Sequence, residues 1–286
     1  MAIVLDNITY TYGMGTPFEK TALHGISLTI ENGEFLGVIG HTGSGKSTFV
    51  QHLNGLLHPT TGKVTVNGVD ISASTEEAKK MRHKVGMVFQ YPEHQLFEET
   101  IAEDIAFGPK NLGLSSDEVD ERVRDAMKFV GLDYNTYAER SPFHLSGGQM
   151  RRVAIAGVVA MNPDFLVLDE PSAGLDPFGR EEIFEEIIRL HKEKGITVIL
   201  VSHNMEDISR MASRLVVLDK GRIVLDGEPM DIFNNHRDAL QAVGVDVPPV
   251  SVTMEYLREQ GIDVSNRVLS VDDAVQAILE GGSHVK

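Results

Sequence analysis

The chain has 286 residues, of which 42% are hydrophobic and 24% charged, a composition typical of a globular protein with a substantial core. Its 42 acidic and 26 basic residues give a formal net charge of −16, which argues against a nucleic-acid-binding surface. It contains no cysteine, which excludes disulfides, thiolate metal sites and a cysteine nucleophile and is compatible with the cytosol.

The first part of the chain is predicted to consist mainly of strands. Asn32-Gly33 and Asn67-Gly68 are each typical of a hairpin turn between two apolar runs. We therefore expect one hairpin around each dipeptide. The predicted strands are 3–12, 26–30, 35–39, 64–66, 69–71 and 85–89.

A glycine-rich segment follows the run 35–39. Residues 40–47 fit the pattern G-x-x-x-x-G-K-S/T, and the next apolar residues, among them Phe49 and Leu56, recur at helical spacing. Glycines let backbone amides turn toward phosphates at a helix N-terminus, where Lys46 would add charge and Ser47 would ligate Mg²⁺. The alternative is a glycine turn with a chance lysine. The predicted phosphate-binding residues are Gly40, His41, Thr42, Gly43, Ser44, Gly45, Lys46, Ser47 and Thr48.

Residues 91–161 are predicted to be mainly helical. Ser115 and Glu118 have the spacing of a capping box, and Ser146 is positioned to cap a second helix that ends at Asn162-Pro163. Two glycines after Ser146 would expose backbone amides at the positive end of that helix. The sequence thus predicts a second anion-binding helix N-terminus, formed by Ser146, Gly147, Gly148 and Gln149.

Near-continuous apolar strands return at 165–168 and 197–201, separated by a helix predicted over 181–194. This alternation is typical of a parallel sheet that is buried on both faces. The first strand ends in Asp169 and Glu170, so two carboxylates are expected at the sheet edge where ligands bind. Asp169 is suited to hold Mg²⁺ and Glu170 to orient or deprotonate a water, whereas the alternative is a solvated strand end.

The last part of the chain has a weaker pattern. Runs at 214–218 and 222–225 predict a final hairpin. Pro248-Pro249 is interpreted as a linker, and two short helices are expected near 254–260 and 271–280.

These motifs stand in the order found in ATP-binding-cassette (ABC) ATPases, and residues 1–230 resemble that family. The resemblance implies an α/β fold, with a P-loop NTPase (RecA-like) core, an antiparallel β subdomain and an inserted helical signature subdomain at about 91–161. Residues 231–286 would form a C-terminal extension that is a candidate dimer contact. In family order the motifs are Walker A at 40–47, the Q-loop at Gln90, the signature at 145–149, Walker B at 165–169, the D-loop at 172–176 and the switch His203.

The resemblance also implies a role for each position. Tyr12 would stack on adenine, with Tyr10 as the rival candidate. Gln90 would sense the γ-phosphate, Glu170 would act on the attacking water, and His203 would donate to the γ-phosphate. Two cassettes would pack head to tail, so that the signature of one faces the nucleotide of the other. The implied magnesium ligands are Ser47, Gln90 and Asp169, and the implied cofactors are ATP and Mg²⁺.

Residues 86–109 resemble the ATPases of energy-coupling-factor (ECF) vitamin transporters, and 40–45 and 151–157 match the second of their two paralogous ATPases. The resemblance implies an ATP-hydrolysing subunit that powers uptake of a vitamin or similar micronutrient, with cobalt or nickel left open. Its partners would be a paralogous ATPase, with a homodimer left open, a membrane coupling subunit contacting about 91–107, and a substrate-binding membrane subunit. No nucleic-acid partner is expected.

The resemblance to ECF ATPases implies a location at the membrane, and no membrane-spanning segment is expected in this chain. No apolar run approaches the roughly 20 residues that cross a bilayer, and the N-terminus lacks the pattern of a signal peptide. We therefore expect a peripheral protein on the cytoplasmic face of the cell membrane.

Three other functions share some of these motifs. A conventional ABC importer ATPase for a metal ion or other small solute differs only in partner and substrate. A soluble ABC protein acting on DNA or ribosomes is disfavoured, because about 100 residues separate Lys46 from Ser146, too few for a long coiled coil, and because the chain holds one cassette. A non-hydrolysing scaffold is disfavoured because Glu170 and His203 are both present.

Overall fold

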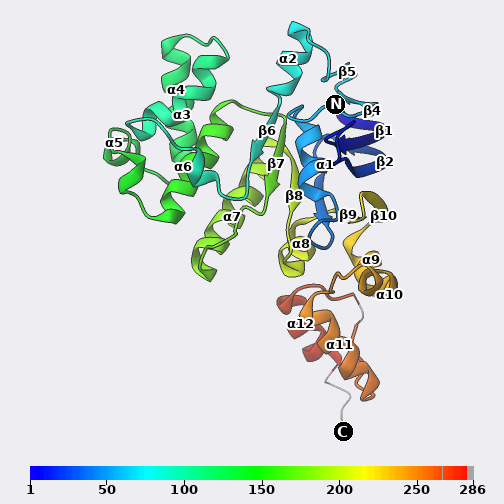
Figure 1. The fold of residues 1–286 in the computed structure, drawn as a ribbon. Helices are drawn as coiled ribbons and strands as arrows, with labels where there is room; N and C mark the ends of the chain where they lie inside the picture. Colours follow the sequence, from blue (N-terminus) through cyan, green and yellow to red (C-terminus); the bar gives the residue numbers. More distant parts are fainter. Residues whose placement is uncertain (266, 282–286) are drawn as a thin grey trace.

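The computed structural model describes residues 1–265 and 267–281, and within these ranges ten strands form two sheets (Figure 1). The smaller sheet is antiparallel, in the order β2-β1-β4-β5. The larger sheet has the order β10-β9-β3-β8-β7-β6, and its neighbours run parallel except for the β9–β10 hairpin. The strands are β1 (Ala2–Tyr12), β2 (Lys20–Glu31), β3 (Phe35–Ile39), β4 (Thr61–Val66), β5 (Val69–Asp70), β6 (Val85–Val88), β7 (Phe165–Asp169), β8 (Thr197–Val201), β9 (Arg214–Asp219) and β10 (Arg222–Gly227).

Helix α1 (Lys46–Leu53) lies between the two sheets (Figure 1). Its residues Phe49, Val50 and Leu53 share one buried cluster with side chains of the antiparallel sheet and of one face of the larger sheet. Strands β3, β7 and β8 are buried at every position, as expected for a parallel sheet covered on both faces. Leu56, predicted on the apolar face of α1, lies beyond its end and is exposed.

The predicted hairpin at Asn32-Gly33 is wrong. Strand β2 belongs to the antiparallel sheet, whereas β3 pairs in parallel with β8 and β9 in the other sheet. The physical reason is burial, because β3 is apolar at every position and needs cover on both faces, whereas β2 has an exposed face. The predicted hairpin at Asn67-Gly68 is confirmed, since β4 and β5 pair across it.

The predicted helical region is confirmed, and it lies beside the β6 edge of the larger sheet (Figure 1). Both expected caps form, with Ser115 accepting from the Glu118 amide and Ser146 from the Gln149 amide. The apolar face of the first capped helix, which includes Val123 and Met127, is buried. The elements here are α3 (Ile101–Asn111), α4 (Ser116–Phe129), α5 (Tyr134–Tyr137) and α6 (Gly147–Ala160), with 3₁₀ turns at Pro92–Gln95 and Pro142–His144.

Two helix starts differ from the predictions because of proline. Helix α7 (Pro177–Lys194) begins four residues before the predicted start at 181, since Pro177 occupies its first position and Asp176 caps it. Pro248-Pro249 is not a linker, because Pro249 begins helix α11 (Pro249–Glu259). Proline lacks an amide hydrogen, which the first turn of a helix does not use.

The C-terminal helices lie at the end of the molecule away from the helical region (Figure 1). Helices α11 and α12 enclose a small apolar cluster of their own, around Met254, Val264 and Ala274. None of the helices in the described ranges has the length and apolar character needed to cross a membrane. The remaining helices are α2 (Glu76–Arg82), α8 (Met205–Met211), α9 (Pro229–Asn235), α10 (Arg237–Ala242) and α12 (Val271–Gly281).

Candidate functional site

The glycine loop between β3 and α1 requires glycine at two positions. Gly40 has a φ of 150°, and a Cβ atom there would lie 2.2 Å from the Leu218 carbonyl oxygen. Gly45, with a φ of 106°, precedes α1 and approaches the Ala22 carbonyl. Side chains would therefore clash or strain the backbone at both positions. The loop can pass close to neighbouring backbone and present the N-terminus of α1 to an anion.

Lys46 folds back onto this loop. Its Nζ donates to the carbonyl oxygens of Gly40 at 2.6 Å and His41 at 3.0 Å. Burial lowers the pKa of Lys46, and the carboxylates of Glu170 and Asp169 oppose that shift. The ammonium is thus the positive centre of a site with two nearby acids.

The end of β7 supplies those acids. Asp169 is buried and hydrogen-bonded to the Ser47 hydroxyl, and burial raises its pKa while Ser47 and Lys46 lower it. Glu170 has a φ of 53°, the left-handed region that a non-glycine residue rarely adopts. Burial and the neighbouring Asp169 carboxylate raise the pKa of Glu170. Such raised values accompany general bases, although structural ion pairs also produce them.

His203 follows β8 and faces Glu170. Its Nε2 lies 2.9 Å from Glu170 Oε1. Burial and the positive charge of Lys46 lower the pKa of His203, with Asp169 opposing them, which favours the neutral imidazole. The structure therefore places the carboxylate and the imidazole in direct contact at the carboxyl edge of the sheet.

The predicted residues meet in an open cleft of about 550 Å³. The cleft also includes residues that the sequence patterns did not single out, notably Lys20 on β2 and Lys220 in the β9–β10 turn. The turn at Lys220 was visible as a hairpin, but its proximity to the glycine loop depends on the tertiary fold. The predicted residues that line the cleft are Tyr12, Thr42, Gly43, Gly45, Lys46, Ser47, Thr48, Gln90, Asp169, Glu170 and His203.

Three residues of the glycine loop do not line the cleft. Gly40 and Ser44 are buried, and the Ser44 hydroxyl has no hydrogen-bond partner among the described residues. His41 turns away and its Nε2 lies 2.9 Å from Asp219 Oδ1. His41 thereby connects the loop to the end of β9.

The two tyrosines of β1 have different surroundings. Tyr12 lines the cleft, is 42% exposed, and its hydroxyl is 3.1 Å from the Thr48 hydroxyl. Tyr10 packs edge-on between Tyr12 and His52, with ring centroids 4.7 and 4.9 Å apart. This geometry favours Tyr12 over Tyr10 for contact with a base in the cleft.

The signature segment lies outside this cleft. Ser146 caps α6, and both Ser146 and Gly147 are exposed on the helical region. A Cβ atom added at Gly147 or Gly148 would meet nothing within 4 Å among the described residues. The N-terminus of α6, which the sequence predicts to bind an anion, is therefore open and does not contact the chain's own glycine loop.

The oxygen atoms in the cleft fit a magnesium ion that is also bound by phosphate. Ser47 and Asp169 are hydrogen-bonded to each other and supply hard oxygen donors. Within the described ranges, no group of three or more His, Cys, Asp and Glu side chains could hold a metal ion. Magnesium usually keeps waters and phosphate oxygens as ligands, so this partial donor set is appropriate.

The fold and the cleft define an ATPase of the ATP-binding-cassette class, because the glycine loop, the β7 carboxylates and His203 meet on one α/β scaffold. The sequence profile of the ABC transporter family matches residues 23–173. "Energy-coupling factor transporter ATP-binding protein EcfA2" of Clostridium tetani is 53% identical over 280 residues, 98% of this chain and 97% of that protein. The chain belongs to the ABC transporter family and, within it, to the energy-coupling-factor transporter ATP-binding proteins.

Further relatives agree with this assignment. The EcfA2 protein of Clostridium acetobutylicum is 54% identical over 279 residues, 98% of this chain and 97% of that protein. The structure of cbiO1 from Clostridium perfringens, described as part of the ABC transporter complex cbiONQ, has a TM-score of 0.73 and 36% identity, covering 88% of this chain and 98% of that one. A dimeric post-hydrolysis structure of the ATP-binding cassette MJ0796 with ADP and Pi has a TM-score of 0.70 and 31% identity, covering 79% and 98%. The predicted fold class, family and ATPase activity are confirmed.

Proposed function

We propose that this chain is the ATP-hydrolysing subunit of an energy-coupling-factor transporter and that a second ATPase subunit completes its active site. One observation carries this proposal. Most of the glycine loop, Gln90, Glu170 and His203 line one cleft, whereas Ser146 and the helix that it caps do not line it. The γ-phosphate of a nucleotide in the cleft would therefore not be contacted by the chain's own Ser146 helix. The Ser146 helix of an opposing cassette would contact it instead.

Different residues of the cleft would bind the nucleotide, hold Mg²⁺ and act on the attacking water. The loop amides and Lys46 would hold the β- and γ-phosphates, and Tyr12 would stack on adenine. Ser47, Gln90 and Asp169 would hold Mg²⁺, which neutralises charge that develops on the phosphates. Glu170 would orient or deprotonate the attacking water, and the neutral His203 would donate to the γ-phosphate.

The Glu170→Gln variant tests this assignment. We expect the variant subunit in the complete transporter to bind MgATP normally but to lose turnover by about 100-fold or more, since proton transfer typically contributes 10²–10⁴-fold. The measurements are steady-state phosphate release and equilibrium nucleotide binding. Normal turnover in the variant would contradict the role of Glu170.

The segment 91–107 is the proposed contact for a membrane coupling subunit. Phe97 and Phe107 are 57% and 46% exposed and pack edge-on with centroids 4.9 Å apart. Asp104 accepts hydrogen bonds from the amides of Phe97 and Glu98, which fixes the turn that presents them. Apolar rings beside several acids suit a partner helix with apolar and basic side chains, whereas the alternative is a solvated helix start.

Charge reversal separates these two alternatives. The Glu98→Lys/Glu99→Lys variant should weaken assembly with the membrane subunit while MgATP binding stays unchanged. Co-purification from detergent-solubilised membranes measures the first and calorimetry the second. Unchanged recovery of the membrane subunit would favour the solvated helix start.

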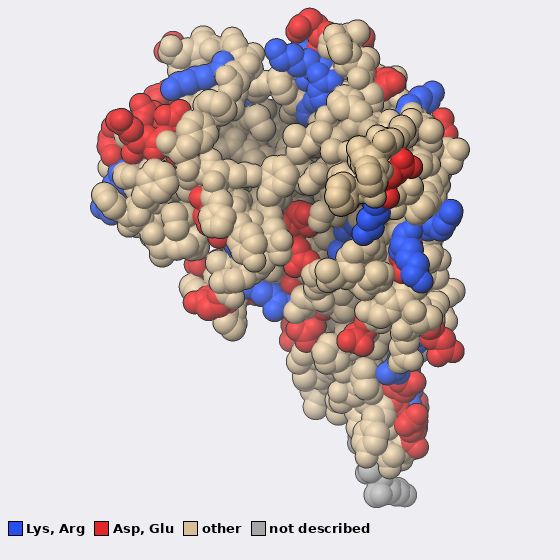
Figure 2. Space-filling model, viewed as in Figure 1, with Lys and Arg blue, Asp and Glu red and all other residues tan. Residues whose placement is uncertain are grey.

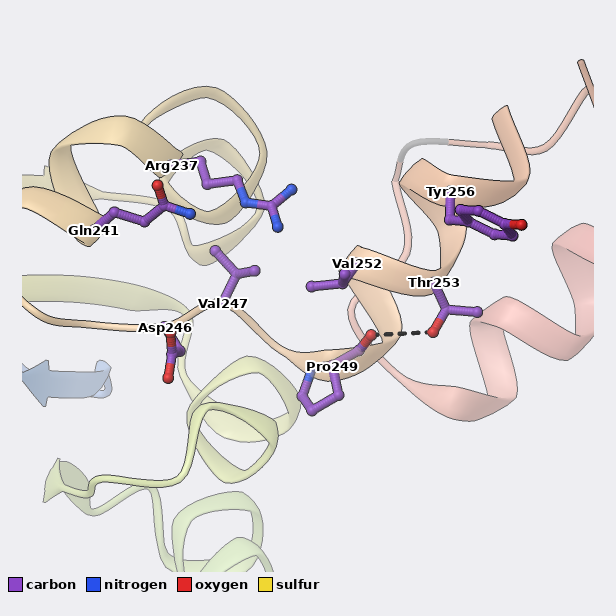
Figure 3. Close-up of a pocket in the computed structure, with 8 residues that line it drawn as sticks. All are labelled: Arg237, Gln241, Asp246, Val247, Pro249, Val252, Thr253 and Tyr256. Carbon is purple, nitrogen blue, oxygen red and sulfur yellow. Dashed lines mark hydrogen bonds between the residues drawn. The ribbon is translucent and has the colours of Figure 1, made fainter. Parts of the chain in front are cut away.

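We also propose that the chain divides into a nucleotide-binding unit, 1–230, with its helical subdomain at about 91–161, and an extension, 231–286, that contacts the second ATPase. Exposed apolar side chains on α11 and α12 support this, among them Tyr256, Val271 and Val275. Figure 3 shows Arg237 on α10 pointing toward α11. Arg237 forms an ion pair with Glu255 of α11 and lines a groove of about 610 Å³.

The second ATPase and the transported molecule are part of the same proposal. The relatives are named as energy-coupling-factor transporter ATP-binding proteins. Together with the resemblance of residues 86–109 to that class, this supports a paralogous ATPase as partner and uptake of a vitamin or similar micronutrient through a separate membrane-bound substrate subunit. A peripheral position on the cytoplasmic face of the membrane follows from such an assembly. On the face in Figure 2, basic side chains of the described residues form small separate groups rather than one continuous patch.

Co-purification decides the transporter class. A paralogous cassette together with a polytopic coupling subunit would support the proposal. Recovery of a pair of permease subunits with no paralogous ATPase would instead favour a conventional ABC importer.

A further inference from the structure

Arg151, in the second turn of α6, is 1% exposed. Arginine is rarely buried to this extent unless its charge and its donors are matched. The Arg151 guanidinium lies between two loops of the active site, the turn after Glu170 and the loop after Gln90. It contacts each loop with a different edge.

One edge holds the turn that follows Glu170. Nη1 of Arg151 donates to the carbonyl oxygens of Pro171 and Ala173, each at 2.8 Å. The Ala173 amide donates back to the Glu170 carbonyl at 3.1 Å, which closes the turn. Because Glu170 has a φ of 53°, an unfavourable value for glutamate, its backbone has to be held by neighbouring groups.

The other edge holds the loop that follows Gln90. Nε and Nη2 of Arg151 donate to the Glu93 carboxylate at 3.1–3.2 Å, and Nη2 lies 3.5 Å from the Gln90 carbonyl oxygen. A guanidinium has five donors in a rigid plane, so one arginine can bridge both loops. A lysine ammonium is a compact point charge and cannot reproduce this bridge.

We propose that Arg151 is a positioning residue for ATP hydrolysis, which fixes the Glu170 carboxylate and the Gln90 loop relative to each other and to the signature helix. The proposal rests on the function proposed above for Glu170. Arg151 is on the same helix as Ser146, five residues further on, so the bridge rigidly connects the proposed trans-acting helix N-terminus with the chain's own hydrolytic carboxylate. Arg151 itself does not line the nucleotide cleft.

The test compares variants in the complete transporter and in the isolated full-length chain. In the Arg151→Met transporter we expect kcat to fall by about 100-fold, because displacement of a catalytic group by about 1 Å can cost that much. MgATP binding to the isolated variant chain should change less than threefold. Arg151→Lys, which keeps the buried charge beside Glu93, should lower kcat in the same direction and covers the case in which the methionine variant does not fold.

Arg214→Met is the matched control for a general loss of stability. Arg214 is partly buried and, like Arg151, donates hydrogen bonds to both carboxylate and backbone oxygens, here those of Glu34, Asp226 and the Thr29 carbonyl, but it lies outside the cleft. This variant should lower the melting temperature and leave kcat within about twofold.

A double variant tests whether Arg151 acts through Glu170. If it does, adding Arg151→Met to Glu170→Gln should lower the residual turnover by less than about threefold, because the group being positioned is already gone. A full further 100-fold loss, or an Arg151→Lys transporter with wild-type kcat, would overturn the proposal. Normal turnover by Glu170→Gln would instead overturn the function assigned to Glu170, so the two failures are distinguishable.

Discussion

At the scale of single residues, the ionisation of Glu170 should be visible in the pH dependence of the reaction. Burial and Asp169 raise its pKa above the ordinary value of 4.5, with Lys46 opposing them. A general base works only when ionised, so activity should rise with pH through this elevated pKa. The acid limb of kcat/KM, which reports the free enzyme, is expected above pH 4.5.

The control for this profile is a second carboxyl with a raised pKa far from the cleft. Glu186→Gln removes such a carboxyl on α7 and should leave the acid limb of kcat/KM in place. An acid limb at or below pH 4.5 in the wild-type transporter would contradict the assignment of Glu170 as base.

The two tyrosines of β1 offer a comparison of binding and stability. Tyr12→Ala removes an exposed ring that lines the cleft and should weaken MgATP binding about fivefold or more, as stacking on a base is worth about 1–3 kcal/mol. Tyr10→Ala removes a ring packed between Tyr12 and His52 and should mainly lower stability, by about 1 kcal/mol or more. Calorimetric binding and thermal unfolding measure the two effects, and the reverse pattern would make Tyr10 the adenine contact.

At the scale of elements, helix α7 carries a half-buried acid that makes the stability of the fold depend on pH. Burial raises the pKa of Glu186 to about 7, with Glu182 adding to the shift and Arg152 and Arg189 opposing it. Its folded-state pKa exceeds the unfolded value of 4.5, so its stabilising contribution is complete below pH 4.5 and is lost as pH rises through 7. One of its carboxylate oxygens has no hydrogen-bond partner among the described residues, consistent with a protonated form.

The Glu186→Gln variant should therefore flatten this dependence. At pH 8 it is expected to be more stable than the wild type by about 1–2 kcal/mol, a figure reduced for partial solvent screening. Urea unfolding at several pH values measures the difference. Glu185→Gln, an exposed neighbour on the same helix, is the control, and identical pH dependence of Glu186→Gln and the wild type would refute the expectation.

The elements also show what local sequence can and cannot specify. The helix caps at Ser115 and Ser146 were predictable from local sequence. In each capping box, both hydrogen bonds join the serine and the residue three positions later. The pairing of β3 was not predictable from local sequence, since Asn32-Gly33 resembles a hairpin turn. Only the burial of β3 on both faces assigns it to the parallel sheet. The same limit applies to the site, where Glu170 was found from its strand but Arg151 was not, because its partners are 20 to 61 positions away.

At the scale of the whole molecule, the two anion-binding helix N-termini of this chain serve different nucleotides in the proposed assembly. The loop before α1 opens into the chain's own cleft, and the cap of α6 does not. A single chain would then bind ATP without hydrolysing it efficiently, and turnover would depend on closure of a pair. This separation explains how hydrolysis can be coupled to movement of a membrane partner, because the active site is complete only when two subunits have closed on each other.

The Ser146→Arg variant tests whether the α6 cap acts on a partner's nucleotide, with Ser115→Arg as the control. An arginine at the exposed cap of α6 should leave MgATP binding by the isolated chain unchanged but lower turnover of the assembled transporter by about 100-fold, since one group that stabilises transition-state charge is worth 10²–10³-fold. Ser115→Arg removes the equivalent capping box of α4, so it should cost the same roughly 1 kcal/mol of helix stability without loss of turnover. Phosphate release by the complex and calorimetry on the chain measure both. Loss of nucleotide binding in isolated Ser146→Arg, or equal turnover of the two variants, would mean that the α6 cap does not act on a partner's nucleotide.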